Sequence, residues 1–286
     1  MDWKGKGGLT YESRRINGRR YRLFLSLIIT NYTRITMTSE VFNTDCLEYM
    51  RTLPDKAFQL TIADPPYGDA NSDVGGGKRF GERFDRYKQS EPCGGVDLKG
   101  TTVSWTGGTW AAKYGKKIVS WDEAPQQIFF DELLRVSEAV IIWGGNYFSL
   151  PPSRCFLVWE KTNIPENFTM AMCEYAWTSM SGNAKVFKGT SLRNEHSGKF
   201  HPTEKPIELY AWCLRLFAKP GDRIFDPMMG SQSSRIAAYK MGFDYVGCEL
   251  DKEYFDKGCE RFNRECKGEI VTAGGHIVKQ TSLFDL

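Results

Sequence analysis

The sequence predicts an α/β protein with a mostly parallel sheet of seven strands. Short apolar runs alternate along the chain with stretches of helical periodicity, which is typical of parallel strands joined by crossover helices. A length of 286 residues is enough for one large domain with a full core. The apolar fraction of 41% and the aromatic fraction of 14% are those of an ordinary globular protein.

The strands and helices follow from these runs in chain order. Each predicted strand is a short, mainly apolar run: 41–44, 58–63, 139–143, 155–159, 174–179, 223–225 and 245–248. Each predicted helix has apolar residues three or four positions apart: 46–52, 126–136, 206–218, 233–241 and 252–266. Most strands are therefore followed by a helix, as a parallel sheet requires.

Residues 1–36 form a basic N-terminal extension that we expect to contribute little to the fold. They hold eight Lys and Arg against two acids, a net charge of +6, whereas the whole chain carries +3. The remainder is therefore at −3 and needs a local basic patch for any nucleic-acid contact. The apolar run 23–29 is too short to span a bilayer. A basic DNA-contacting arm is the alternative interpretation.

The eight cysteines favour reduced thiols in a cytoplasmic protein. They are scattered along the chain and form no Cys-x-x-Cys pair, which argues against a disulfide scaffold and against a zinc site. The three histidines, at 196, 201 and 276, are too few for a His-based metal centre. No metal is predicted.

Asp64-Pro65-Pro66-Tyr67 directly follows the predicted strand 58–63. Proline has no N–H group, so the carbonyls of the two prolines are free to accept hydrogen bonds from another molecule. Asp64 adds a carboxylate acceptor and Tyr67 a flat ring. Acceptors beside a stacking surface suit a planar ring with an exocyclic amino group, such as a nucleobase. The alternative is a Pro-Pro turn that only ends a strand.

A second candidate site follows the predicted strand 223–225. There Asp226-Pro227-Met228-Met229-Gly230-Ser231 forms a tight turn before a helix, and Glu249 ends the next strand. This order is the geometry of a nucleotide-type site, in which the acid accepts the ribose hydroxyls. The turn lacks the lysine and the several glycines of a phosphate cradle. We therefore expect a cofactor without phosphates, and S-adenosylmethionine fits.

From about Met37 to Asn263 the chain resembles the amino-methylating DNA methyltransferases, which methylate adenine N6 or cytosine N4. Four segments carry the resemblance: 64–67, 141–148, 201–206 with the sequence His-Pro-Thr-Glu-Lys-Pro, and 226–231. It implies a Rossmann-like S-adenosylmethionine-dependent fold with one antiparallel strand and helices on both faces. The catalytic motif precedes the cofactor turn, as in the circularly permuted beta subgroup. Compact members of that kind are common in bacteriophages and prophages.

The resemblance also assigns roles to individual residues. Catalysis falls to Asp64, Pro65, Pro66 and Tyr67, and cofactor binding to Asp45, Cys46, His201, Lys205, Asp226, Pro227, Gly230, Ser231 and Glu249. Asp45 and Cys46 are expected near the cofactor's adenine, and His201 with Lys205 near its methionine end. Without the family pattern, Asp45 is a helix N-cap and Lys205 a solvated lysine.

The cofactor turn departs from the family pattern at two places. The family usually has an aromatic residue before the first glycine and a second glycine two residues after it. This chain has Met228 and Met229 before Gly230, and Gln232 after it. A side chain in place of glycine is expected either to crowd the cofactor or to donate a hydrogen bond to it.

The methyltransferase domain is expected over 37–266, with a C-terminal tail at 267–286. Within it, the Gly-rich insertion 68–118 mixes nine Lys and Arg with six aromatic residues, which suits DNA contact; a surface insertion is the alternative. The basic segment 182–200 is predicted to be a second recognition loop. Gln280-Thr281-Ser282-Leu283-Phe284 resembles the peptide that bacterial DNA enzymes dock into the sliding clamp; a frayed tail is the alternative.

The predicted function is therefore site-specific DNA adenine-N6 methylation of a flipped-out base. An aspartate at the first motif position favours adenine, since cytosine-N4 enzymes more often have serine there. Three alternatives stay open: cytosine-N4 methylation, methylation of RNA or of a protein glutamine, and a catalytically lapsed DNA-binding homologue. The predicted partner is double-stranded DNA. A homodimer, and a sliding clamp bound through residues 280–284, are further options, and no membrane is expected.

Overall fold

The computed structural model describes residues 37–68, 94–96, 102–104, 123–164, 171–191, 200–271 and 275–279. The chain divides into two units, Met1–Thr36 and Met37–Leu286, and every described residue belongs to the second. The N-terminal extension, most of the 68–118 insertion and residues 280–286 lie outside the described residues.

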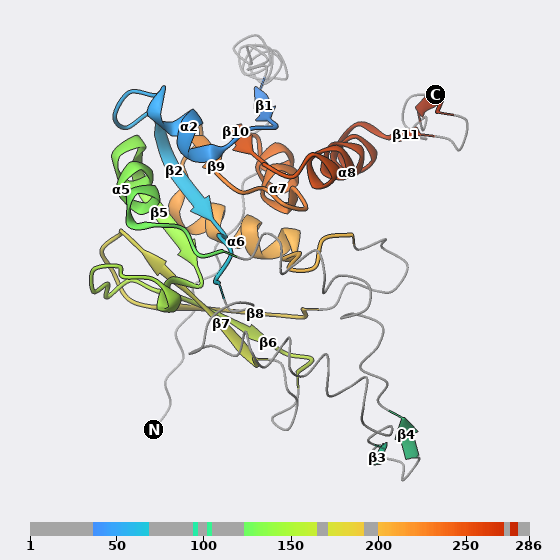
Figure 1. Ribbon diagram of the computed structural model, residues 1–286, viewed down its shortest axis with the longest axis horizontal. Coiled ribbons are helices and arrows are strands. Elements are labelled where there is room, and N and C mark those ends of the chain that lie inside the picture. The colour runs from blue at the N-terminus through green and yellow to red at the C-terminus, as the bar shows by residue number, and fades with distance from the viewer. Residues whose placement is uncertain are drawn as a thin grey trace, which may run out of the picture. The chain divides into compact units, whose positions relative to one another are not determined.

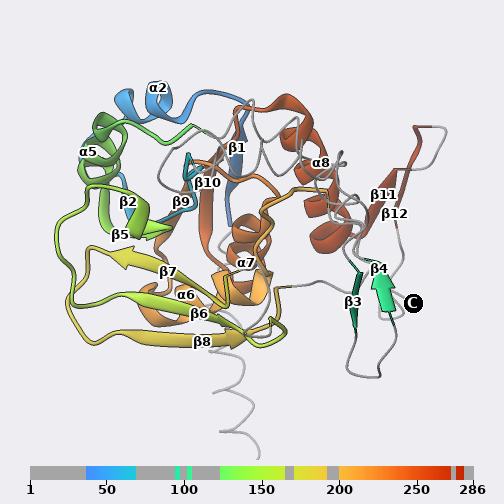
Figure 2. The same cartoon turned by 60° about the horizontal axis from the view of Figure 1, so that its bottom comes forward.

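An eight-stranded sheet forms the centre of the described fold (Figure 1). β7 pairs antiparallel with both of its neighbours, and all other neighbouring pairs in this sheet are parallel. Figure 2 shows β7, β6 and β8 side by side at one end. In spatial order the strands are β1 (Ser39–Phe42), β10 (Asp244–Cys248), β9 (Arg223–Asp226), β2 (Phe58–Ala63), β5 (Ser137–Trp143), β7 (Cys173–Thr178), β6 (Leu157–Lys161) and β8 (Lys185–Gly189).

The predicted number of seven strands is wrong, because the sequence pattern did not reveal β8. This strand lies inside the segment 182–200, which is therefore not a loop throughout. β8 is an edge strand with three of its five residues exposed, so its lysines face solvent and hide the alternation of a half-buried strand. Two small antiparallel pairs were also not predicted: β3 (Gly94–Val96) with β4 (Thr102–Ser104), and β11 (Glu269–Val271) with β12 (Ile277–Lys279).

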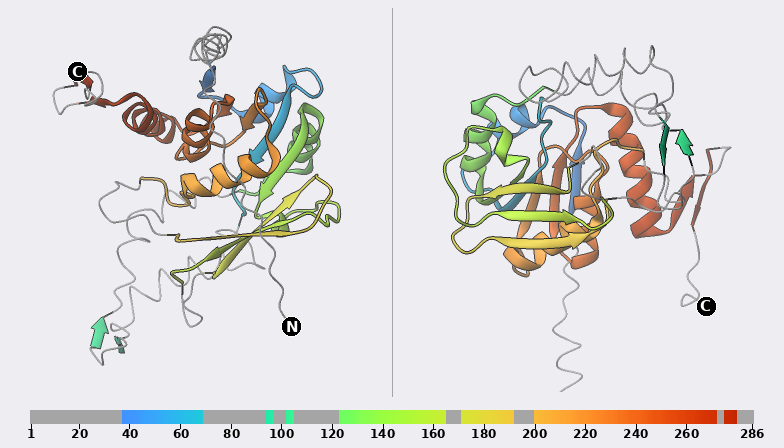
Figure 3. Two further views of the ribbon diagram at one scale, coloured as in Figure 1. Left: turned by 180° about the vertical axis from the view of Figure 1, so that it is seen from behind. Right: turned by 90° about the horizontal axis from the view of Figure 1, so that it is seen from below.

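Helices pack on both faces of the sheet, as predicted (Figure 3). Buried residues of α6 (Ile207–Phe217) and α7 (Ser233–Met241) share one core cluster. Those of α2 (Cys46–Arg51) and α5 (Gln127–Val136) share the other. The predicted helix 252–266 is α8 (Lys252–Phe262), which continues as the π-helical turn η3 (Asn263–Lys267). None of the described helices has the length and apolar character needed to span a lipid bilayer.

β5 illustrates why the central strands read as continuous apolar runs. Ile141 and Trp143 belong to the core beneath α6 and α7, whereas Val140 and Ile142 belong to the core beneath α2 and α5. All four side chains are completely buried. A strand covered on both faces needs apolar residues at every position, so its sequence shows no polar alternation.

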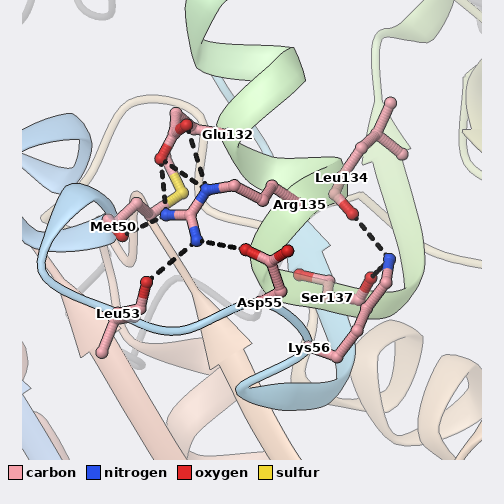
Figure 4. Close-up of polar contacts among 8 residues, drawn as sticks. All are labelled: Met50, Leu53, Asp55, Lys56, Glu132, Leu134, Arg135 and Ser137. Atoms are coloured by element: carbon pink, nitrogen blue, oxygen red, sulfur yellow. Dashed lines mark hydrogen bonds and ion pairs between the residues drawn. The ribbon is translucent and has the colours of Figure 1, made fainter.

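A polar network joins the start of β2 to the C-terminal end of α5 (Figure 4). The Arg135 guanidinium donates to the carbonyls of Met50 and Leu53 and pairs with Asp55 and Glu132. Lys56, whose φ of 56° is left-handed, donates through Nζ to the carbonyls of Leu134 at 2.8 Å and Ser137 at 2.6 Å. The bond to Leu134 satisfies a carbonyl in the last turn of α5, which has no intrahelical partner, and the bond to Ser137 ties the same lysine to the start of β5.

We expect Lys56→Met to lower the free energy of unfolding by about 1–2 kcal/mol, because both carbonyl contacts of the ammonium are lost. Urea unfolding measures this change, with Lys185→Met on the exposed edge strand as a control that should cost less than about 0.5 kcal/mol. Equal stability of the two variants would show that the Lys56 contacts contribute nothing.

Candidate active site

The carboxyl edge of the sheet gathers segments from five strands. Asp64–Tyr67 follows β2, Gly144 follows β5, Asp226–Ser231 begins at the end of β9, and Glu249 follows β10. These four strands are parallel neighbours, so their carboxyl ends meet at one edge. β7 runs in the opposite direction, and its amino end brings Glu174 to the same edge.

Asp64 forms a buried ion pair with Lys205. Lys205 Nζ lies 2.5 Å from Asp64 Oδ1, and the two side chains are 4% and 13% exposed. The Tyr67 hydroxyl donates to the same Asp64 oxygen at 3.0 Å and accepts from Lys205 Nζ at 3.3 Å. Lys205 is therefore not a solvated lysine: it contacts the Asp64–Tyr67 platform directly.

Glu174 and Lys161 extend this ion pair, and the sequence did not single out either residue. Glu174 lies 3.3 Å from Lys205 Nζ through one carboxylate oxygen and 2.7 Å from Lys161 Nζ through the other. Lys161 ends β6 and is 7% exposed. In the sequence, Lys161 is a charged residue at the end of one apolar strand and Glu174 a charged residue at the start of the next. The antiparallel pairing of β6 with β7 brings these two strand ends together, and this pairing could not be known from the sequence.

Burial and charge act against each other in this cluster. Burial raises the pKa of the Asp64 carboxyl, even though Lys205 acts to lower it. Burial alone would lower the pKa of Lys205, but Asp64 and Glu174 hold it well above its usual value. Burial would also raise the pKa of Glu174, yet Lys205 and Lys161 keep it below its usual value. Lys205 is consequently a permanent cation beside Asp64.

The Tyr67 ring is held by the segment that follows β5. It stacks on Tyr147 with ring centroids 4.8 Å apart and 13° between the planes, and Phe148 meets it edge-on. Gly144 adopts a left-handed φ of 68°, and a Cβ there would lie 2.1 Å from the Tyr67 ring. A Cβ on Gly145 would lie 2.4 Å from Trp177. The two glycines thus allow the backbone to approach close enough to fix the platform.

The turn after β9 is built around two acids. Asp226 accepts hydrogen bonds from the backbone N–H of Met228 and from Ser234 Oγ, and burial raises its pKa to about 7. Glu249 accepts from the backbone N–H of Gly230 at 2.8 Å and from that of Asp251 at 2.9 Å; burial raises its pKa as well. Within the described residues, no three His, Cys, Asp or Glu side chains are grouped so that they could hold a metal ion.

His201 lies against this turn. A Cβ on Gly230, whose φ is 50°, would come within 3.0 Å of the His201 ring. The His201 ring also meets the Tyr254 ring edge-on, with ring centroids 4.4 Å apart, and its Nδ1 lies 3.3 Å from Thr203 Oγ1. The segment that carries His201 and Lys205 therefore touches both the turn after β9 and the Asp64 platform.

Gln232 occupies its glycine-like position with the side chain turned away from the turn. Its backbone is left-handed, with φ at 60°, and its side chain is completely buried. The amide donates to the Phe255 carbonyl of α8 and accepts from Arg235. It fills the space that Gly258 leaves open, since a Cβ there would lie 2.6 Å from Gln232 Nε2. The side chain therefore packs against α8, whereas the sequence had suggested that it would either crowd a cofactor or donate a hydrogen bond to it.

A buried ion pair between Arg261 and Glu204 contacts the turn after β9. Arg261 of α8 is 1% exposed and donates to the Ser231 carbonyl at 2.8 Å and to Ser233 Oγ at 3.0 Å. It also pairs with Glu204 at 3.3 Å, next to Lys205 in the chain. Neither residue stands out in the sequence. Glu204 is the variable position of the His-Pro-Thr-x-Lys-Pro element, and only the fold reveals its partner.

Asp45 and Cys46 lie at the start of α2, after β1. Asp45 is the N-cap, and its carboxylate accepts from the backbone N–H groups of Leu47 at 2.7 Å and Glu48 at 3.1 Å. Cys46 is buried, and burial together with the charges of Asp45 and Glu249 raises the pKa of its thiol to about 12. A thiol with so high a pKa is an apolar wall rather than a nucleophile.

Comparison with known proteins adds the family. The model of the N6_N4 methyltransferase family, described as DNA methylase, matches residues 113–260, just over half of the chain. The chain belongs to this family. The matched range contains the Gly144–Gly145 segment, Glu174, Lys205, the Asp226 turn and Glu249, and it begins after the Asp64–Tyr67 platform.

Individual relatives are distant. The chain is 23% identical over 264 residues to the type II methyltransferase M.HinfI of Haemophilus influenzae, covering 78% of this chain and 67% of that one. It is 26% identical over 225 residues to YubD of Escherichia coli (strain K12), named as a methylase, with coverages of 76% and 87%. A solved complex of a Thermus thermophilus protein, named as a DNA modification methylase, with S-adenosyl-L-methionine is 17% identical, with a TM-score of 0.45 and coverages of 81% and 96%.

Gly144→Ala should displace Tyr67, because the added Cβ would overlap its ring. Gly221→Ala is the matched control: its φ of 90° is also left-handed, but nothing lies within 4 Å of the added Cβ. We expect Gly144→Ala to lower the free energy of unfolding by about 1–3 kcal/mol more than Gly221→Ala does, as measured by urea unfolding. Because both positions have a left-handed backbone, the difference reports the overlap with Tyr67 and not the backbone strain. An equal loss of unfolding free energy in the two variants would mean that the Tyr67 ring can move aside without destabilising the fold.

The Asp226 carboxyl should make stability depend on pH. Its folded pKa of about 7 exceeds the ordinary 3.8, so its contribution is fully present below about pH 4 and is lost as pH rises through 7. The complete loss is on the order of 4 kcal/mol. Relative to the parent, Asp226→Asn should therefore gain stability between pH 5 and pH 8 in urea unfolding. Asp222→Asn, at the opposite end of β9, is the control, and an equal pH dependence in both variants would contradict the assignment.

Proposed function

We propose that the protein is a DNA adenine-N6 methyltransferase that uses S-adenosylmethionine and acts on a flipped-out base. The observation that carries this proposal is the parallel pairing of β2 with β9, through Leu60 with Ile224 and Thr61 with Phe225. It puts the Asp64–Tyr67 platform beside the turn that starts at Asp226. An amino group held by the platform would face a methyl donor held by the turn.

The residues of the turn after β9 fit S-adenosylmethionine. The buried carboxylates of Asp226 and Glu249 suit an ammonium group and ribose hydroxyls, and the missing Cβ of Gly230 leaves room beside His201. When bound, S-adenosylmethionine supplies an electrophilic methyl group on a sulfonium centre. The residues proposed to hold it are Asp226, Pro227, Gly230, Ser231 and Glu249, with Asp45 and Cys46 near its adenine and His201 and Lys205 near its methionine end.

The platform would activate the amino group of the target base. The lone pair of an exocyclic amino nitrogen is delocalised into its ring, so the nitrogen is a poor nucleophile. If the Asp64 carboxylate and the Pro65 carbonyl accept hydrogen bonds from its two N–H groups, the nitrogen becomes more tetrahedral. Its lone pair is then less delocalised into the ring and is available for attack. The positive charge that develops there would lie against acceptors already in place, and once the nitrogen carries the methyl group one of its protons would pass to the Asp64 carboxylate. Tyr67 and Pro66 would line the pocket for the flipped base.

Adenine N6 is the proposed target because the first platform residue is an aspartate. Cytosine N4 is the alternative, since its amino group offers the same two N–H bonds. The order of the two motifs supports assignment to the circularly permuted beta subgroup, in which compact phage and prophage enzymes are common.

The position of Gln232 favours an active enzyme over a lapsed homologue. Its amide is engaged with α8 and Arg235, so it leaves the turn free for a cofactor. Membership of a DNA methylase family favours DNA over RNA or protein glutamine as the substrate.

We also propose the macromolecules that the protein binds. Double-stranded DNA is the proposed substrate, with residues 68–118 and 182–200 as its contacts, in a bacterial cytoplasm. Most of 68–118 and residues 192–199 lie outside the described residues, as do residues 280–286 with the clamp-like peptide. Binding to the sliding clamp is proposed from the sequence of residues 280–284, and a homodimer is a further option.

Asp64→Ala or Tyr67→Ala should reduce methyl transfer by at least about a hundredfold while cofactor affinity changes little. The rate can be followed with tritiated S-adenosylmethionine on genomic DNA from a strain that lacks DNA methyltransferases, and the affinity by calorimetry. Asp55→Ala, at the other end of β2 and 75% exposed, is the matched control and should keep full activity. An Asp64→Ala variant as fast as the parent would refute the mechanism.

Mass spectrometry of nucleosides from the methylated DNA tests the function itself. N6-methyladenine supports the proposal and N4-methylcytosine supports the alternative. If the parent binds S-adenosylmethionine but leaves both bases unmodified, DNA is not its substrate; if it does not bind the cofactor, it is a lapsed homologue.

A further inference from the structure

The Lys205 ammonium lies between two carboxylates from different parts of the chain. Asp64 Oδ1 is 2.5 Å away and Glu174 Oε2 is 3.3 Å away. The ammonium also contacts the Tyr67 hydroxyl and lies over the Tyr67 and Trp143 rings, 5.8 and 5.9 Å from their centroids. With 4% of its side chain exposed, Lys205 has little water to share its charge with. The positive charge of Lys205 is therefore balanced mainly by Asp64 and Glu174, and how it is divided between them affects how strongly each carboxylate can accept other hydrogen bonds.

Glu174 is itself held in place from the other side. Its second oxygen pairs with Lys161 Nζ at 2.7 Å, and Lys161 lies over the Trp159 ring at 5.2 Å. Trp159 and Glu174 are register partners in the antiparallel pair β6–β7. Figure 2 shows these two strands side by side. The result is a row of alternating charges, Asp64, Lys205, Glu174 and Lys161, whose sum is zero. The backbone pairing of β6 and β7 fixes its far end.

If Lys205 paired with Asp64 alone, it would weaken Asp64 as a hydrogen-bond acceptor. A cation 2.5 Å from a carboxylate oxygen draws electron density from it, and so competes with the N–H groups of an incoming base. A second carboxylate on the same ammonium reduces that pull. We propose that Glu174 is a positioning residue that shares the Lys205 ammonium with Asp64 and so keeps Asp64 a strong acceptor for the target amino group. The catalytic part of this inference rests on the proposed function.

The electrostatics of the site agree with this geometry. The Glu174 charge acts to raise the pKa of Asp64, whereas Lys205 acts to lower it. Removing the Glu174 charge should therefore lower the pKa of Asp64. The other ionisable groups that act on Asp64 come from its own segment, from α6 and from the turn after β9: Tyr67, Tyr210 and Asp226. Glu174→Gln changes none of these side chains, although the Glu174 charge also acts to raise the pKa of Tyr67.

The test compares Glu174→Gln, Glu174→Asp and Glu160→Gln in the full-length protein. Glu160 is the matched control: it lies in β6, is 45% exposed and pairs with Lys188 on the edge strand. NMR of protein carrying ¹³C-labelled aspartate carboxyls follows the titration of Asp64, which is assigned by its disappearance in Asp64→Asn. Methyl transfer to genomic DNA from a methyltransferase-deficient strain is measured against pH. Calorimetry gives the affinity for S-adenosylmethionine.

We expect Glu174→Gln to shift the Asp64 titration and the acid limb of the rate profile together to lower pH. Its kcat should fall on the order of tenfold to a hundredfold while cofactor affinity stays unchanged. Glu174→Asp, which keeps the charge, should recover most of both effects, and Glu160→Gln should match the parent. A variant that merely unfolds would lose cofactor affinity and would not be rescued by aspartate.

An unchanged Asp64 titration in Glu174→Gln would overturn the inference, whatever the activity. A shifted titration with an unchanged rate profile would overturn the catalytic role of Glu174. A parent that methylates no DNA, but whose Asp64 titration shifts in Glu174→Gln, would overturn the proposed function and leave the charge sharing supported. The two proposals therefore fail by different observations.

Discussion

A lysine with only 4% of its side chain exposed must have negative charge beside it, and much of the candidate active site follows from that requirement. Lys205 brings the segment before α6 against Asp64, so the chain after β8 and the loop after β2 meet at one point. The same segment carries His201 against Gly230 and Glu204 against Arg261. One short stretch thus joins the acceptor platform, the turn after β9 and α8.

The antiparallel direction of β7 supplies the rest of that charge. In a fully parallel sheet the amino end of each strand lies far from the carboxyl edge, where ligands of α/β proteins bind. β7 reverses this, and Glu174, the second residue of the strand, arrives beside Lys205. The reversal therefore changes which residues of the strand can reach the site.

The sequence predicted the central strands and the covering helices well, because burial on both faces leaves long apolar runs such as that of β5. It failed at β8, where exposure at the sheet edge removes that signal. Within the site, the Asp64–Tyr67 platform and the Asp226 turn are local motifs and could be read directly from the chain. Glu174, Lys161, Glu204 and Arg261 could not, because each owes its role to a partner far away in the sequence. The N-cap role of Asp45, by contrast, was visible locally.

The packing of Gln232 against Gly258 constrains how this family member can change over time. While Gln232 keeps this conformation, a Cβ at residue 258 would lie 2.6 Å from its amide nitrogen, so a larger residue there would force the Gln232 side chain to move. Once residue 232 becomes glycine, the space opens and residue 258 can accept a larger side chain. A substitution at residue 258 should therefore be less destabilising in a protein that carries glycine at 232 than in this one. The residue at 232 therefore influences which side chains the facing position of α8 can carry.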